Sequence, residues 1–185
     1  RSHQLYFWPD KRNVVAKSLR SFLKLADPKA LEATAFGQQS VAVQGLQAME
    51  WLHFVPSKDA AQSGYRCQLA LRIAAHLHET MTSVLKEGQT YWAKGLEKGA
   101  GEPAKKEIYA AFFQGTYDQL TLITDQKLGP ALTEKKARKA LRSTDGWRSG
   151  RSLRNIVQNL VALSRLFQPN QGLAALLPKD KKGLA

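Results

Sequence analysis

The segment from Gly45 to Phe54 carries polar side chains at a spacing that helical proteins use to hold ligands. On a helix, Gln47, Glu50 and His53 are spaced i, i+3 and i+6 and lie along one face. Glu50 and His53 form a Glu-x-x-His pair, which helical bundles use to bind a metal ion when other helices supply the remaining ligands. The structural alternative is that Glu50 makes an internal hydrogen bond or ion pair and His53 lies at a helix end.

A second pair with the same spacing consists of His76 and Glu79. His78 lies two residues from His76 and therefore faces a different direction. Because Leu77 and Met81 are expected to face the core, we expect these polar groups to flank that face rather than to bind a metal.

The segment from Trp147 to Ile156 contains three Arg and two Ser residues at the predicted start of a helix. Free backbone N–H groups and the helix dipole favour negative charge at such a position. Arg148, Ser149 and Ser152 are therefore candidate ligands for an anion. The alternative is a helix capped by Ser152, with a basic flank in solvent.

Near the start of the chain, the sequence Phe-Trp-Pro-Asp-Lys-Arg-Asn opens a predicted helix. Asp10 is a candidate cap for that helix. The aromatic and charged residues Trp8, Asp10 and Arg12 could instead line a pocket.

Several motifs of known chemistry are missing from the sequence, including the Walker loop, the dinucleotide glycine pattern, His-Glu-x-x-His and the nucleophile elbow. The single cysteine, Cys67, excludes an intramolecular disulfide and a Cys-rich zinc site. It precedes an apolar helix, and we expect it to be a small buried residue.

Helical periodicity dominates the elements that must position these residues. The first apolar stripe recurs along residues 15–26, and Asp27-Pro28 starts a new helix. Further helices are predicted over Val41–Phe54, ending before Pro56, and over about residues 59–95. The inner face of the latter consists of Ile73, Leu77, Met81, Val84 and Leu85.

In the second half, a helix that begins near Ala104 has a broad apolar face and should end at Gly129-Pro130. That face consists of Ile108, Tyr109, Phe112, Phe113, Tyr117 and Leu120. A last helix has Ser152 as its candidate N-cap and stops at Pro169. Its apolar face consists of Leu153, Ile156, Val157, Leu160, Leu163 and Phe167. No segment alternates as a strand does, so the predicted fold class is all-α.

Composition sets further limits on function. The chain has 185 residues, 43% of them hydrophobic, and a net charge of +13. Residues 134–165 hold nine basic and two acidic groups, so the excess is local. A polyanion such as nucleic acid is one partner that this charge allows, although no recognisable nucleic-acid-binding motif accompanies it.

Five segments, taken in order, resemble the imelysin family, also known as the M75 peptidases. They are FWPDKRN, GLQAMEWLHF, GYRCQLALRIAAHL, DQKLGPAL and GWRSGRSLRNIVQNLVAL. The second resembles the signature helix of the family, written Gly-x-His-x-x-Glu. Gly45 and Glu50 match that signature, but residue 47 is Gln where the family has His.

The resemblance implies two up-and-down helical bundles related by a pseudo-repeat, with a ligand cleft between them. The first bundle half would comprise residues 1–97, a linker 98–103, and the second half 104–185. Family members usually extend beyond both ends of this sequence, so the second bundle is expected to be truncated here.

The resemblance also implies an exported bacterial protein whose signal peptide has been removed, periplasmic or anchored to the outer membrane as a lipoprotein. Its role would be iron or haem uptake. Partners would be a small anionic or iron-containing ligand and iron-uptake components at the membrane, and the candidate cofactors are iron, zinc and haem. The alternatives are a metallopeptidase, with Glu50 and His53 as candidate metal ligands, and a nonspecific binder of nucleic acid or another polyanion.

The departure at residue 47 bears on catalysis. A neutral amide cannot act as a general base near neutral pH and is a poor ligand for zinc or iron. We therefore expect a binding protein without catalytic residues. Its candidate site residues are Gly45, Gln47, Glu50, Trp8, Asp10, Arg12, Arg148, Ser149 and Ser152.

Overall fold

The computed structural model describes residues 2–10, 12–57, 62–97, 101–133 and 135–168. Every regular element in these ranges is a helix, which confirms the all-α class. The predicted pseudo-repeat of two bundles and the predicted domain boundaries stay predictions. The chain divides into two compact units, Arg1–Ile108 with Arg148–Gly150 and Tyr109–Trp147 with Arg151–Ala185. Each unit is described by itself.

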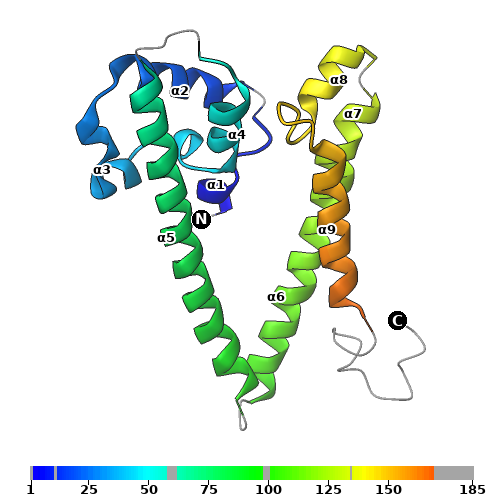
Figure 1. The fold of residues 1–185 in the computed structure, drawn as a ribbon. Helices are drawn as coiled ribbons and strands as arrows, with labels where there is room; N and C mark the ends of the chain where they lie inside the picture. Colours follow the sequence, from blue (N-terminus) through cyan, green and yellow to red (C-terminus); the bar gives the residue numbers. More distant parts are fainter. Residues whose placement is uncertain (1, 11, 58–61, 98–100, 134, 169–185) are drawn as a thin grey trace. The chain divides into compact units, whose positions relative to one another are not determined.

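In the first unit, short helices gather around the N-terminal part of one long helix (Figure 1). The predicted stripe on α2 (Val14–Leu25) is confirmed, because Val15, Leu19 and Leu23 are buried in the core. The core also takes side chains from α3 (Ala33–Gly37), α4 (Leu46–Phe54) and α5 (Ser63–Leu96). The other elements of this unit are α1 (Ser2–Leu5), η1 (Pro28–Leu31) and η2 (Val41–Val43).

Caps predicted from the sequence hold two of these helices. The Asp10 carboxylate accepts hydrogen bonds from the N–H groups of Val14 (2.6 Å) and Val15 (3.0 Å) at the start of α2. Asp27 accepts from the N–H of Lys29 (3.0 Å), and Pro28 follows it as the first residue of η1. Each carboxylate satisfies backbone donors that have no partner inside the helix.

The single helix predicted over Val41–Phe54 is wrong in its first part. The structure has a short 3-10 turn, η2, and a separate helix, α4, that begins after Gly45 and ends at Phe54 as predicted. The break occurs because Gly45 is in an extended conformation, with φ −102° and ψ −172°. The side chain of Ser40 caps η2 through the N–H of Ala42 (3.3 Å).

The long helix α5 forms as one continuous element, as the sequence allowed. Leu69 and Ile73 are fully buried, and Leu77 packs against the same core. The C-terminal part of the predicted inner face is wrong, because three of its residues are exposed: Met81, Val84 and Leu85. The elements that pack on α5 contact it near its start, so the apolar stripe continues past the core that covers it. Cys67 is exposed, which corrects the expectation of a buried thiol.

In the second unit, helix α6 (Glu102–Thr121) does not end at Gly129-Pro130 as predicted. It runs into a π-helical segment, η4 (Leu122–Leu128), and then into α7 (Gly129–Thr133). The N–H of Gly129 bonds to the carbonyl of Thr124, five residues back. This wider turn lies directly before Pro130 and accommodates its ring and its missing N–H, so the helix continues.

The last helices of the second unit are α8 (Ala137–Ser143) and α9 (Ser152–Leu166). Ile156 and Leu163 of α9 pack with Ile123 of η4 in a small core, and the two helical segments run side by side (Figure 1). Ser152 is the first residue of α9 rather than its cap, and its Oγ lies 2.8 Å from Oγ1 of Thr144. The predicted stop at Pro169 lies outside the described residues.

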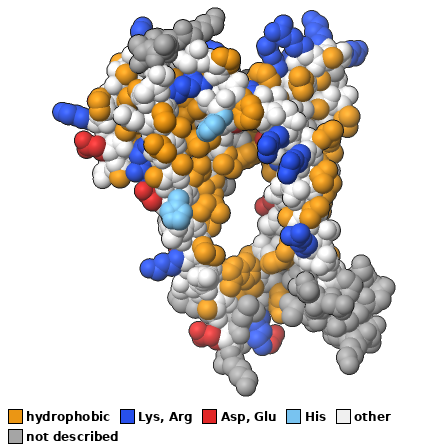
Figure 2. Space-filling model, viewed as in Figure 1, with side chains coloured by type: hydrophobic (Ala, Val, Ile, Leu, Met, Phe, Trp, Pro, Cys, Tyr) orange, Lys and Arg blue, Asp and Glu red, His pale blue; other side chains and the backbone are white. Residues whose placement is uncertain are grey.

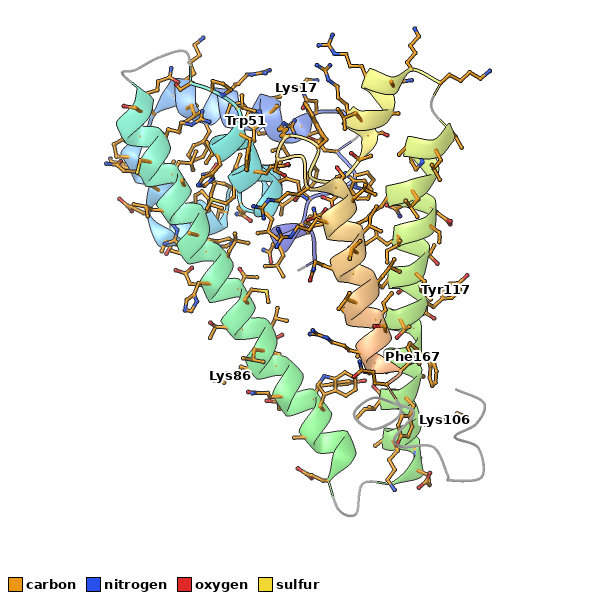
Figure 3. The ribbon with its side chains drawn as sticks, turned by 45° about the vertical axis from the view of Figure 1, so that its right-hand side comes forward. Lys17, Trp51, Lys86, Lys106, Tyr117 and Phe167 are labelled. Carbon is orange, nitrogen blue, oxygen red and sulfur yellow. The ribbon has the colours of Figure 1, made fainter. Side chains whose placement is uncertain are left out.

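Much of the predicted apolar surface of this half is exposed, which corrects the broad buried faces expected from the sequence. On α6, Phe112 is half-buried and only Ile108 of the predicted face is buried. Tyr117 projects from α6, and Phe167 directly follows the last residue of α9 (Figure 3). The exposed members are Tyr109, Phe113, Tyr117 and Leu120 on α6, and Leu153, Val157, Leu160 and Phe167 at α9.

Candidate functional site

The site is built at the N-terminus of α4, where α1 approaches closely. A Cβ added to Gly45 would lie 2.8 Å from the carbonyl oxygen of Leu5 and 3.0 Å from that of Gln4. Real Cβ atoms do not approach backbone oxygens so closely, so only glycine fits between α1 and α4. Gly45 therefore positions the first turn of α4, which carries the next candidate residue.

Gln47 lies in that first turn and is 7% exposed. Its Oε1 accepts no hydrogen bond from the described part of the chain. A buried amide remains neutral across the working pH range, so Gln47 supplies neither a proton acceptor nor a charge.

A second buried glutamine, Gln44, stands one turn before Gln47 and was missed by the sequence reasoning. Its amide nitrogen donates to the carbonyls of Phe36 (2.8 Å), Gln39 (3.0 Å) and Gly37 (3.2 Å). These bonds fix the end of α3 against η2. No local pattern distinguished Gln44 from a surface glutamine, because its partners lie on the preceding loop.

Glu50 is joined to a segment 99 residues away in the sequence. One of its oxygens, Oε1, accepts from the N–H of Ser149 (2.9 Å) and from the hydroxyl of Ser149 (2.8 Å). Both donors and the carboxylate are partly buried. The structure thus brings together two predicted site residues, and the carboxylate holds the Arg148–Gly150 segment on the first unit.

Arg148 extends the same contact. Its guanidinium donates to the side-chain oxygen of Asn13 (3.3 Å), the residue that precedes α2. Gly150 has φ of +69° and Gly146 has φ of +67°, conformations that suit glycine and turn the backbone on either side of Trp147–Ser149. Ser149 and Arg148 therefore reach α4 and the start of α2 from one short turn.

The three candidate site residues before α2, which are Trp8, Asp10 and Arg12, differ in their surroundings. Both carboxylate oxygens of Asp10 cap α2, so the capping interpretation describes its contacts. Trp8 is half-buried, with its ring centroid 6.5 Å from that of Tyr6. Arg12 is exposed. Ser152 belongs to the second unit, where it contacts Thr144.

The donor set around Glu50 does not fit a zinc or non-haem iron centre. His53 is exposed, and its Nδ1 lies 2.8 Å from the carbonyl oxygen of Met49. Gln47 is a poor metal ligand, and Oε1 of Glu50 already accepts two hydrogen bonds. Across the described ranges, no three or more His, Cys, Asp or Glu side chains gather in a metal-binding group.

Arg66 of α5 caps the C-terminal end of α4. Nothing in the sequence indicated this role. Its guanidinium donates to the carbonyls of Leu52 and Val55 and lies 5.2 Å from the ring of Trp51. Burial lowers the pKa of Arg66 below its ordinary value. Trp51 itself is buried on α4 (Figure 3). Gly45 at the N-terminus and Arg66 at the C-terminus thus fix the two ends of the helix that carries Gln47 and Glu50.

The second His–Glu pair flanks the core, as expected. Arg72 donates to both oxygens of Glu79 at 2.8 Å, and the His76 ring packs edge-on against Phe36. The pKa of His76 is lowered, chiefly because burial disfavours the charged ring. Glu79 raises it and Arg72 lowers it to smaller extents. This cluster stabilises the α3–α5 contact.

The second unit contains a buried ion pair that the sequence did not indicate. Nζ of Lys127, in the π-helical segment, lies 2.9 Å from Oδ2 of Asp145 and 2.8 Å from Oδ1 of Asn159. Asn155 also donates to Asp145 (3.3 Å). Lys127 and Asp145 are each 5% exposed in their side chains. The cluster ties η4, the turn before α9 and α9 together.

Comparisons with known proteins agree with the sequence motifs. The family model described as Imelysin, of the M75 peptidases, matches residues 1–185. Neither the comparison with curated proteins nor that with solved structures gave a match. Within the described ranges, none of the helices combines the length and apolar character needed to cross a membrane. The match covers the whole chain, and the protein therefore belongs to the imelysin family.

Proposed function

We propose that this member of the imelysin family is a non-catalytic binding protein that takes part in iron or haem uptake. The observation that carries the proposal is the pairing of Glu50 with Ser149 beside a buried Gln47. One oxygen of the Glu50 carboxylate holds a backbone segment, and the Gln47 amide on the same helix cannot take up a proton. Both features favour binding over hydrolysis.

Hydrolysis of a peptide requires an activated nucleophile and a group that accepts its proton. In metallopeptidases the metal ion activates the water, and that ion needs at least three protein ligands. Among the described residues, the donors around Glu50 do not supply three such ligands, which supports a binding role. In this proposal the site binds a ligand and does not hydrolyse it.

The chemistry of the Arg148–Gly150 segment favours an anionic ligand. Arg148 supplies a permanent positive charge with several donors, which suits the carboxylates of haem propionates or of a ferric chelate. Glu50 has a positioning role in this proposal, because it holds Ser149 and thereby sets the place of Arg148. We also propose that the protein acts after export, in the periplasm or anchored to the outer membrane, where iron-uptake components would be its partners.

Equilibrium titration with ferric haem and with ferric citrate tests the proposal. Arg148→Ala should weaken binding by about 10- to 100-fold, since a hydrogen bond to a charged group contributes about 1.5–3 kcal/mol. Lys29→Ala removes an exposed cation on η1 and is the matched control. Circular dichroism should show unchanged helicity. Equal affinity of the wild type and Arg148→Ala for both ligands would contradict the site.

Substitutions of Glu50 distinguish a binding protein from a metallopeptidase. If Glu50 only positions Ser149, Glu50→Gln retains an acceptor oxygen and should bind ligand better than Glu50→Ala. A metallopeptidase would instead lose all turnover in Glu50→Gln. Cleavage of peptides by the purified protein, abolished both by a chelator and by Glu50→Gln, would overturn the proposal.

A further inference from the structure

The end of the second unit formed by α7 and α8 is strongly basic. Residues 132–142 hold five Lys or Arg residues and one acidic residue, Glu134, which lies outside the described residues. All five are exposed, and Figure 2 shows Lys and Arg side chains gathered over α8. We call this surface the basic tip. It consists of Leu132, Lys135, Lys136, Arg138, Lys139, Leu141 and Arg142.

Large apolar side chains stand within the same surface. Leu132 on α7 is 79% exposed and Leu141 on α8 is 55% exposed, although α7 and α8 pack on each other. Leucine side chains this exposed obtain only part of the stabilisation that full burial would give. At the boundary between lipid headgroups and acyl chains, both the leucine and the surrounding cations are stabilised.

The combination favours a lipid surface over single-stranded nucleic acid. Proteins that hold single strands pair their basic grooves with aromatic side chains on which bases stack. Residues 131–143 contain no aromatic side chain. The next aromatic residue along the chain is Trp147, in the turn that follows. The guanidinium of Arg142 lies 5.5 Å from the centroid of its ring.

We propose that the basic tip docks on a membrane surface that carries anionic phospholipids, with Leu132 and Leu141 at the depth of the headgroups. The cations supply attraction to the negative surface, and the leucines supply contact with the acyl boundary. The inference does not depend on the ligand or activity of the α4 site. It names a place at which the folded protein meets a membrane.

Flotation with lipid vesicles tests this docking. One set consists of phosphatidylcholine, and the other of equal parts of phosphatidylcholine and phosphatidylglycerol. The wild type should float with the anionic vesicles and not with the neutral ones, and binding should weaken as salt rises. Each basic residue near an anionic surface strengthens binding about fivefold, so Lys135→Ser with Arg138→Ser should weaken it about 25-fold.

Two further variants make the result specific. Lys17→Ser with Lys86→Ser removes the same charge from exposed positions on α2 and α5 and should leave binding within about twofold of wild type (Figure 3). Leu132→Ser keeps the charge and should weaken binding to anionic vesicles about tenfold. Circular dichroism should confirm unchanged helicity for each variant.

Several outcomes would overturn the proposal. Equal flotation with neutral and anionic vesicles would remove the role of charge. Equal losses in the Lys135/Arg138 and Lys17/Lys86 variants would show that net charge alone acts. Unchanged binding by Leu132→Ser, together with tighter binding to duplex DNA than to vesicles, would identify a general polyanion surface instead.

Discussion

The contact between Glu50 and Ser149 predicts a specific energetic coupling. Ser149→Ala removes the hydroxyl bond of 2.8 Å but leaves the backbone bond of 2.9 Å to the same oxygen. A hydrogen bond to a charged group contributes about 1.5–3 kcal/mol to the free energy of unfolding. Because the two hydrogen bonds to Glu50 are partly exposed, we expect their contributions to lie near the lower value. We expect Ser149→Ala to lower the free energy of unfolding by about 1–2 kcal/mol and Glu50→Ala by about 2–4 kcal/mol.

The double variant tests whether the contact between Glu50 and Ser149 causes these losses in the free energy of unfolding. Once Glu50 is Ala, the Ser149 hydroxyl has lost that acceptor, so adding Ser149→Ala should cost little more. The coupling energy should be about 1–2 kcal/mol. Urea unfolding followed by circular dichroism measures the four proteins, and Ser164→Ala, an exposed serine on α9, is the control. Additive losses, with coupling near zero, would refute the reasoning.

Three other predictions concern contacts inside the first unit or inside the second. Gly45→Ala should destabilise the protein by about 1–3 kcal/mol because its Cβ meets backbone oxygens, whereas Gly64→Ala, with open space, should be neutral or stabilising in the same urea assay. Asp145→Ala should cost about 3–5 kcal/mol in urea unfolding by leaving the Lys127 ammonium buried without its carboxylate, and a loss below about 1 kcal/mol would contradict this. The pKa of His76 is lower in the folded protein than in the unfolded chain, so its contribution to stability is complete above about pH 6.5 and is lost as pH falls through the folded pKa. Titration by NMR and loss of this acid dependence in His76→Gln check the sign, and a His76 pKa above the ordinary value would contradict it.

The first unit was largely predictable because its signals are local. Asp10 and Asp27 cap helices within a few residues of themselves, and Pro56 follows the end of α4. The stripe on α2 repeats at helical spacing and is buried. The break at Gly45 was not predicted, because the glycine is required by the approach of Leu5 rather than by a local turn.

The burial of the later helices could not be read from periodicity. An apolar stripe shows which face of a helix avoids water, but not where the elements that cover it end. On α5 that cover ends after Leu77, and Met81 and Leu85 are exposed. The continuation through Pro130 depended on a π turn, which has no clear sequence signal.

The sequence suggested Glu50 and Ser149 as candidate site residues, but it did not indicate the contact between them. Glu50 and Ser149 were both chosen from separate motifs, yet nothing local indicates that residues 99 apart are bonded. The alternative that Glu50 makes an internal hydrogen bond describes its contact with Ser149. The Lys127–Asp145 pair was missed for the same reason, since its two charges lie on segments 18 residues apart.

Hydrogen exchange measured with and without ferric haem or ferric citrate tests the central claim most directly. The proposed ligand binds at Arg148 and at Ser149, which Glu50 holds in place. Bound ligand should therefore slow exchange in peptides covering residues 146–152 and 45–50, and Arg148→Ala should remove that protection. Protection confined to other segments, or none at saturating ligand, would contradict the account.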